Sequence, residues 1–128
     1  MNIRKLMFWA LASSVAVGLA CAQDAAKVDP NHYKVEVDNA EMRILRVHYG
    51  AHEKSVMHSH PDGAVVYLTD GNMNFHLPGG KTQELTGKAG EAHYTPATTH
   101  LPENTGDQGF DAIVIELKHL KGSKSAKK

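Results

Sequence analysis

The sequence predicts an all-β domain, built as a sandwich or barrel of short antiparallel strands. From Tyr33 onward, apolar residues alternate with polar ones or come in short runs. Turn-forming Gly, Pro, Asn and Asp interrupt these runs about every 8–12 residues. No stretch of this region keeps the period of about 3.6 residues that an amphipathic helix requires. A chain of 128 residues has room for one such domain.

Residues 1–22 have the pattern of a secretory signal peptide. Two basic residues precede an uncharged, mostly apolar stretch over residues 6–19, which is short for a membrane span and is followed by small residues. Cleavage is expected after Ala22, which would make the mature protein periplasmic or secreted. The alternative is a lipoprotein, in which Cys21 would carry the lipid.

The composition of the mature chain narrows its chemistry. Cys21 is the single cysteine and would leave with the signal peptide, so neither a disulfide nor a thiolate ligand is expected. The formal net charge is +0 for the full chain and −2 for the mature chain, which loses Arg4 and Lys5 and keeps 12 basic against 14 acidic residues. This charge argues against a nucleic-acid partner. No transmembrane segment is expected after the signal peptide.

The mature chain divides into three parts. Residues 23–33 form a polar leader that we expect to be extended, residues 34–118 form the barrel, and residues 119–128 form a disordered, basic tail. Turns that contain Gly, Asp or Pro separate the expected strands. These strands are Lys34–Asp38, Met42–Tyr49, Ser55–His58, Ala64–Thr69, Asn72–Leu77, Thr82–Thr86, Glu91–Thr95, Thr99–Glu103 and Phe110–Leu117.

His58 and His60 are a candidate pair of metal ligands. Residues i and i+2 of a strand point to the same face and lie about 7 Å apart along the chain, so both imidazoles can reach one ion. Such a site needs a third ligand, and His100 is the candidate, after a strand and a turn that contains Pro96. The alternative is that His58 and His60 are exposed strand residues and that His100 caps a turn.

The two stretches that carry these histidines resemble the sequence motifs of the cupin family. The first motif is matched by Gly50, His58, His60, Pro61 and Gly71. The second is matched by Gly90, Pro96, His100 and Asn104. The resemblance covers residues 43–117 and is closest to small secreted single-domain cupins, some of them described as β-alanine-degradation-type proteins.

The cupin resemblance implies a double-stranded β-helix, or jelly-roll, barrel with a metal ion inside it. Three neutral imidazoles that leave coordination positions open suit one divalent transition metal ion: Zn, Cu, Ni, Mn or Fe(II). The resemblance also implies a homodimer formed through an edge strand. The apolar strand Phe110–Leu117 is expected to contribute to it, because an uncovered strand of this character promotes association.

The glutamate of the first cupin motif is absent. Counting back from the closing glycine, its place falls at Ala64, and the two valines that follow do not replace it. His93, on the strand before His100, is a candidate fourth ligand. Asp62 and His76 are weaker candidates, and water is the default occupant, since catalytic metal sites commonly keep a solvent position.

These features predict a periplasmic or secreted mononuclear metal-binding protein that binds a small polar or anionic molecule at a three-histidine centre. Oxygenase, isomerase and lyase chemistry are all open to such a metal ion. No nucleophile or second carboxylate in the sequence distinguishes them, so catalysis itself is left open. One alternative is a non-catalytic protein of the cell envelope that sequesters or senses a metal or small ligand. Another is a cupin that retains only an interaction surface.

Overall fold

The computed structural model describes residues 23–119, so the predicted signal peptide and residues 120–128 of the predicted tail lie outside it. Within this range the all-β prediction is confirmed. The elements are α1 (Ala25–Val28), β1 (Tyr33–Asp38), β2 (Met42–Tyr49), β3 (His58–His60), β4 (Gly63–Tyr67), β5 (Gly71–His76), β6 (Thr82–Gly87), β7 (Ala92–Thr95), β8 (Thr98–Asn104) and β9 (Phe110–Leu117). Across residues 23–119, the helical segment is too short and too polar to cross a membrane.

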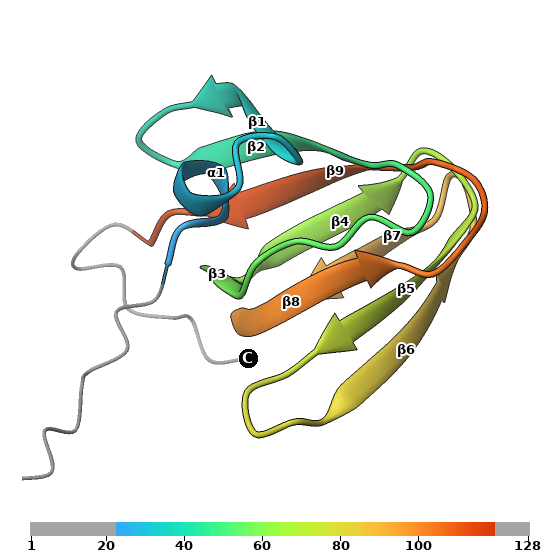
Figure 1. Ribbon diagram of the computed structural model, residues 1–128. Coiled ribbons are helices and arrows are strands. Elements are labelled where there is room, and N and C mark those ends of the chain that lie inside the picture. The colour runs from blue at the N-terminus through green and yellow to red at the C-terminus, as the bar shows by residue number, and fades with distance from the viewer. Residues whose placement is uncertain (1–22, 120–128) are drawn as a thin grey trace, which may run out of the picture.

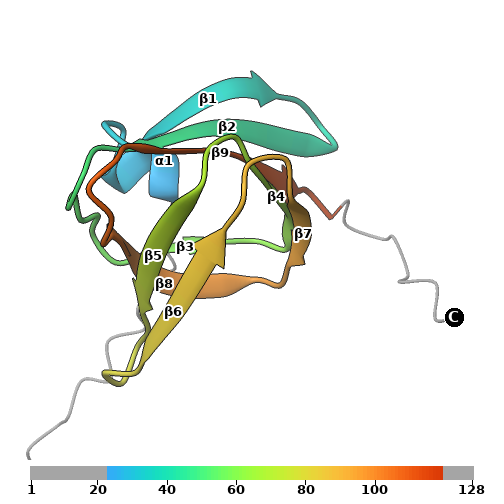
Figure 2. The ribbon, with the colours of Figure 1, turned by 90° about the vertical axis from the view of Figure 1, so that its right-hand side faces the viewer.

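The strands form two antiparallel sheets that face each other (Figure 1). The larger sheet has the order β1-β2-β9-β4-β7, and the smaller has the order β3-β8-β5-β6. Figure 2 shows that both sheets curve around a common interior. Strands that are distant in sequence are neighbours in each sheet, which is the jelly-roll arrangement that the sequence predicted.

The strand Phe110–Leu117 is not at an edge, contrary to expectation. β9 pairs with β2 along its whole length and with β4 on its other side. Its apolar character reflects burial in the middle of the larger sheet, where both edges of its backbone are already hydrogen-bonded. The edges of this sheet are β1 and β7, so a contact between copies through a sheet edge cannot use β9.

Alternation along β2 and β9 builds the interior. Leu45, Val47 and Tyr49 of β2 are buried, as are Phe110 and Ala112 of β9. Successive residues of a strand point to opposite faces, so these side chains all enter the space between the sheets. They form the main part of the hydrophobic core.

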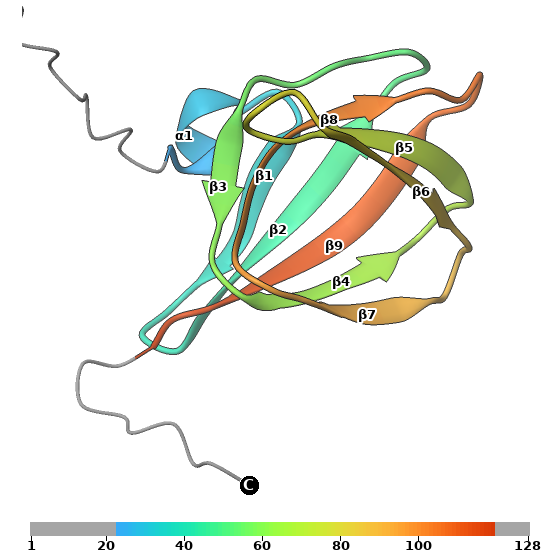
Figure 3. The same cartoon turned by 90° about the horizontal axis from the view of Figure 1, so that it is seen from below.

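The prediction that residues 23–33 are extended is wrong, because the segment before β1 contains the short helix α1. Asp24 caps α1 and accepts a hydrogen bond from the backbone N–H of Lys27 at 3.3 Å. Ala25 is fully buried, and the backbone N–H of Ser59 donates to the carbonyl oxygen of Gln23 at 2.7 Å. The helix therefore packs beside β3 (Figure 3). Four helical residues are too few to show a helical period in the sequence.

Strand β3 also differs from its expected range, Ser55–His58. Ser55 lies before the strand, where its backbone N–H donates to the carbonyl oxygen of Pro102 at 2.9 Å. The regular ladder with β8 pairs His58 with His100 and His60 with Thr98. This register places both histidines of β3 on regular strand backbone, next to the strand that carries the third.

Candidate metal centre

His58, His60 and His100 converge inside the barrel. One ligand nitrogen from each imidazole lies within 4.8 Å of the others. The ring centroids are 4.8 Å apart for His58 and His60, 5.0 Å for His58 and His100, and 5.3 Å for His60 and His100. The structure thus brings together the three histidines that the sequence selected.

Buried nitrogen atoms without partners make this cluster unusual. Among residues 23–119, His58 Nε2 and both ring nitrogens of His100 are buried and have no hydrogen-bond partner. Leaving a buried polar atom unpaired costs about 1–3 kcal/mol. A metal ion bound by these nitrogens would offset that cost. The donor set therefore fits a divalent transition metal ion, for which neutral imidazole is a common ligand.

Hydrogen bonding fixes the orientation of His60. Its Nδ1 lies 2.7 Å from Glu116 Oε1, and Glu116 is only 2% exposed. The other carboxylate oxygen of Glu116 accepts hydrogen bonds from the Arg43 guanidinium at 2.6 Å. Arg43 in turn donates to Asp24 at 2.7 Å. A carboxylate behind a histidine in this way orients the ring and leaves Nε2 for a metal ion.

His58 is oriented by a second set of contacts. Its Nδ1 lies 2.8 Å from the carbonyl oxygen of Val56 and 3.3 Å from the Ser55 hydroxyl. A carbonyl oxygen only accepts, so Nδ1 carries the proton and Nε2 keeps its lone pair. The Ser55 hydroxyl donates to the buried carboxylate of Asp29. Both histidines of β3 are thus supported by carboxylates outside the cluster, one of them through a serine.

Burial keeps two of the imidazoles in the form that binds metal. It lowers the pKa of His58 to about 4 and the pKa of His100 to about 3, with a further lowering from the nearby charge of His60. Both rings are therefore neutral near pH 7, because desolvation disfavours the charged form. Only a neutral imidazole has the lone pair that a metal ion needs.

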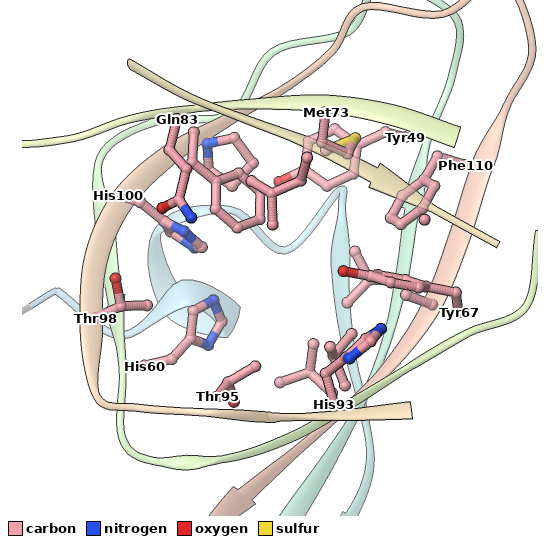
Figure 4. A pocket seen from close by; sticks show the side chains of 18 of the residues that line it. Tyr49, His60, Tyr67, Met73, Gln83, His93, Thr95, Thr98, His100 and Phe110 are labelled. Carbon is pink, nitrogen blue, oxygen red and sulfur yellow. The ribbon is translucent and has the colours of Figure 1, made fainter. Parts of the chain in front are cut away.

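The other candidate ligands lie outside this cluster. His93 lies across the cavity from His60 in Figure 4, is 54% exposed and sits 3.6 Å from Glu91. Asp62 Oδ1 lies 2.6 Å from His119 Nε2, and His76 Nε2 lies 2.6 Å from Glu103 Oε2, so both side chains are engaged in hydrogen bonds elsewhere.

Ala64 does not face the cluster, so the place of the missing glutamate was misread. On β4, Val65 and Tyr67 line the interior cavity. Ala64 lies between inward-facing residues and points to the other side of the sheet. Position 65 is the inward-facing one, and its side chain there is a valine that cannot bind a metal ion.

The three-histidine cluster adjoins a cavity of about 540 Å³ between the sheets. His60 and His100 lie on one wall, and Tyr67 and His93 lie on the opposite wall (Figure 4). Much of the remaining lining is apolar and aromatic, including Phe75 and Phe110. A mostly apolar enclosure beside a few convergent polar groups is typical of a small-molecule site.

Sequence reasoning missed the residues that support the histidines. Glu116 carried a detectable signal, because it alternates in register with Phe110 and Ala112 on the inward face of β9. A carboxylate on a buried face requires a partner. Asp29 and Ser55 carried no such signal, because their contacts depend on the fold of the segment before β1.

Comparisons with known proteins agree with this architecture. A cupin domain structure from Bordetella pertussis Tohama I is 24% identical, with a TM-score of 0.64, over 68% of this chain and 92% of that one. An RmlC-like cupin family protein from Methanocaldococcus jannaschii is 19% identical, with a TM-score of 0.54, over 71% of this chain and 84% of that one. The DMSP lyase DddQ from Ruegeria pomeroyi DSS-3 is 17% identical, with a TM-score of 0.51, over 74% of this chain and 51% of that one. These likenesses show the fold.

The sequence itself shows the family. No curated protein sequence matches the chain. The family described as "Cupin domain" matches residues 45–116, which is more than half of the chain and includes all three clustered histidines. The chain therefore belongs to the cupin family.

Proposed function

We propose that the protein is a mononuclear metal-binding cupin that binds a small molecule next to its metal ion. His58, His60 and His100 would hold one divalent transition metal ion, and the ligand would occupy the adjoining cavity. The observation that carries this proposal is the convergence of three buried imidazoles with unpaired nitrogens beside a cavity of about 540 Å³. Bound there, the ion would act as a Lewis acid towards a coordinated oxygen.

The chain's own residues have defined tasks in this proposal. Glu116 and the Val56 carbonyl hold the β3 imidazoles in orientation. The apolar lining limits water in the cavity, which strengthens electrostatic interactions with a bound molecule. Oxygenase, isomerase and lyase activities are the candidate reactions. The alternative is a non-catalytic protein that binds the metal or a small ligand for sequestration or sensing.

The decisive experiment is elemental analysis of protein purified without chelators, affinity-tag metals or added ions. We expect about one equivalent of one transition metal in the wild type and far less in His100→Ala. Equal metal content in both would contradict the proposed centre. Turnover of a ligand, or its saturable binding without a product, then separates the enzyme from the binding protein.

We also propose that the protein is exported, on the strength of the signal pattern in residues 1–22. Cell fractionation should find the mature chain in the periplasm or medium, and N-terminal sequencing should begin at Gln23. Acylated Cys21 at the N-terminus would instead identify a lipoprotein.

A homodimer is a further part of the proposal, formed through the outer face of the larger sheet. Ile44, Ile115 and Ala64 lie side by side across three strands, and Val66 pairs with Ile113 in the next row. All five are only partly buried. An apolar sheet face that stays open to solvent marks an interaction surface. Light scattering should show a dimer in the wild type and a monomer in Ile113→Lys.

A further inference from the structure

The cavity's lining contrasts with the small polar or anionic ligand that the sequence predicted. The geometry points to an amphipathic ligand: an oxygen-donor head at the metal ion, an aromatic or branched apolar body, and a hydrogen-bonding group that meets Tyr67 and His93. This inference rests on the proposed function and names the class of molecule for the same site.

The apolar part of the lining sets the body of the ligand. Val47, Met73 and Ala112 are buried and line the cavity, as do Val65 and Val114. A polar molecule would lose its hydration against these side chains without gaining hydrogen bonds in return. An apolar body instead gains about 25 cal/mol for each Å² of surface that it removes from water.

Polar groups near the metal cluster define one end of the cavity. Gln83, Thr95 and Thr98 lie around His60 and His100 in Figure 4. Thr98 is paired with His60 in the ladder between β3 and β8, which fixes its place beside the cluster. An oxygen-bearing head bound to the metal ion would lie among these hydroxyl and amide groups.

Tyr67 and His93 define the opposite end. Figure 4 shows the Tyr67 hydroxyl directed into the cavity with His93 beside it. The two ring centroids are 5.6 Å apart, and the strands that carry them are paired. Burial raises the pKa of the Tyr67 hydroxyl, so it remains a hydrogen-bond donor near neutral pH.

The position of Tyr67 depends on a glycine behind it. A Cβ atom at Gly87 would lie 2.8 Å from the Tyr67 ring, which is too close for a real contact. The ring of Phe110 packs on Tyr67 with a centroid separation of 5.7 Å. Tyr67 is thus held between the β6 backbone and an aromatic side chain, with its polar tip left to the cavity.

Two hydroxamates with the same chelating head test the apolar body. The protein loaded with Co²⁺ is titrated with acetohydroxamate and with benzohydroxamate, and binding is followed by the visible spectrum of the ion. We expect benzohydroxamate to bind at least tenfold more tightly. Equal affinities would overturn the inference and leave the proposed metal centre intact. Failure of the wild type to bind Co²⁺ would overturn both.

One substitution with a matched control tests where the apolar body of the ligand binds. Ala112 lies four residues from Glu116 on β9, so Ala112→Leu fills the cavity away from His60. It should abolish the advantage of benzohydroxamate and preserve acetohydroxamate binding, whereas Ala64→Leu, on the outer face, should change neither. An undiminished advantage in a folded Ala112→Leu would overturn the inference.

The polar end is tested with 4-hydroxybenzohydroxamate. Its affinity should fall about tenfold in Tyr67→Phe and stay unchanged in Thr82→Val, which removes an exposed hydroxyl that does not line the cavity. Benzohydroxamate itself should bind both variants equally. Identical affinities of 4-hydroxybenzohydroxamate for the wild type and Tyr67→Phe would show that Tyr67 does not contact the ligand.

Discussion

The two strands that supply the clustered histidines support them differently. On β3, Nδ1 of His58 contacts the Val56 carbonyl and Nδ1 of His60 contacts Glu116. On β8, neither nitrogen of His100 has a partner among residues 23–119, and its ring packs against Phe75 with a centroid separation of 4.3 Å. Hydrogen bonds orient two of the imidazoles and packing orients the third, so the three imidazoles are held in different ways.

The contacts behind β3 reach the segment that precedes β1. One route runs from His60 through Glu116 and Arg43 to Asp24, and the other runs from His58 through Ser55 to Asp29. No similar route supports His100 within the described chain. The segment before β1 therefore holds the groups that in turn contact two of the three candidate ligands, and it does so from outside the regular strands.

The largest expected effect is the loss of metal-dependent stabilisation when any one of the three histidines is replaced by alanine. Metal at a hundredfold excess over Kd stabilises the native state by about 2.7 kcal/mol, which corresponds to a rise in Tm of about 10 °C or more for a domain of this size. Thermal unfolding with and without metal should show this rise in the wild type. His76→Ala and His119→Ala should keep it, since those residues lie outside the cluster.

Acid should destabilise the metal-free protein, and His100 should account for much of the effect. Its pKa is about 3 in the folded state against an ordinary value of 6.5, so below pH 6.5 the unfolded chain takes up a proton that the folded chain does not. At pH 4 this difference costs about 3 kcal/mol. Denaturant unfolding between pH 7 and pH 4 should show a steeper decline for the wild type than for His100→Leu. Parallel declines would mean that His100 is protonated without unfolding.

Replacing Glu116 should weaken metal binding by about 10- to 100-fold, the usual effect of losing a carboxylate that orients a metal-binding histidine. Glu116→Gln keeps the size of the side chain and removes its charge. Chelator competition would measure the affinity directly. Glu103→Gln is the matched control, because Glu103 contacts His76 outside the cluster. If Glu116→Gln and Glu103→Gln lost metal affinity equally, the contact between Glu116 and His60 would have no specific role in metal binding.

The smallest expected effect is at Ala64. Because Ala64 points away from the cavity, Ala64→Glu should change metal affinity by less than about twofold, within ordinary experimental scatter. The same chelator competition applies. A marked rise in affinity would show that position 64 reaches the metal ion after all.

Much of the fold was predictable because β-strand alternation is a local signal. The ranges of β2 and β9 agree with the sequence prediction at both ends. The neighbours of β9 were not predictable, because an apolar strand reads the same at an edge and in the middle of a sheet. Whether such a strand lies at an edge or in the middle is decided by its pairing with segments that are distant in the sequence.

The candidate site was predictable in part for the same reason. His58 and His60 share a face by local geometry, and the motif around His100 supplied the third residue. The place of the missing glutamate depended on counting through a turn, and an error of one residue there reverses the face of a strand. The carboxylates behind the histidines come from segments that only the folded structure brings near.

The central place of β9 also has a consequence for the order in which the chain can fold during its synthesis. Among the strands of residues 23–119, β9 is the last to be synthesised, yet it lies between β2 and β4. Until it emerges, the β1–β2 pair and the β4–β7 pair have no strand to join them. The larger sheet can therefore form only after nearly the whole described chain has been made, and assembly from such distant segments is characteristically slow.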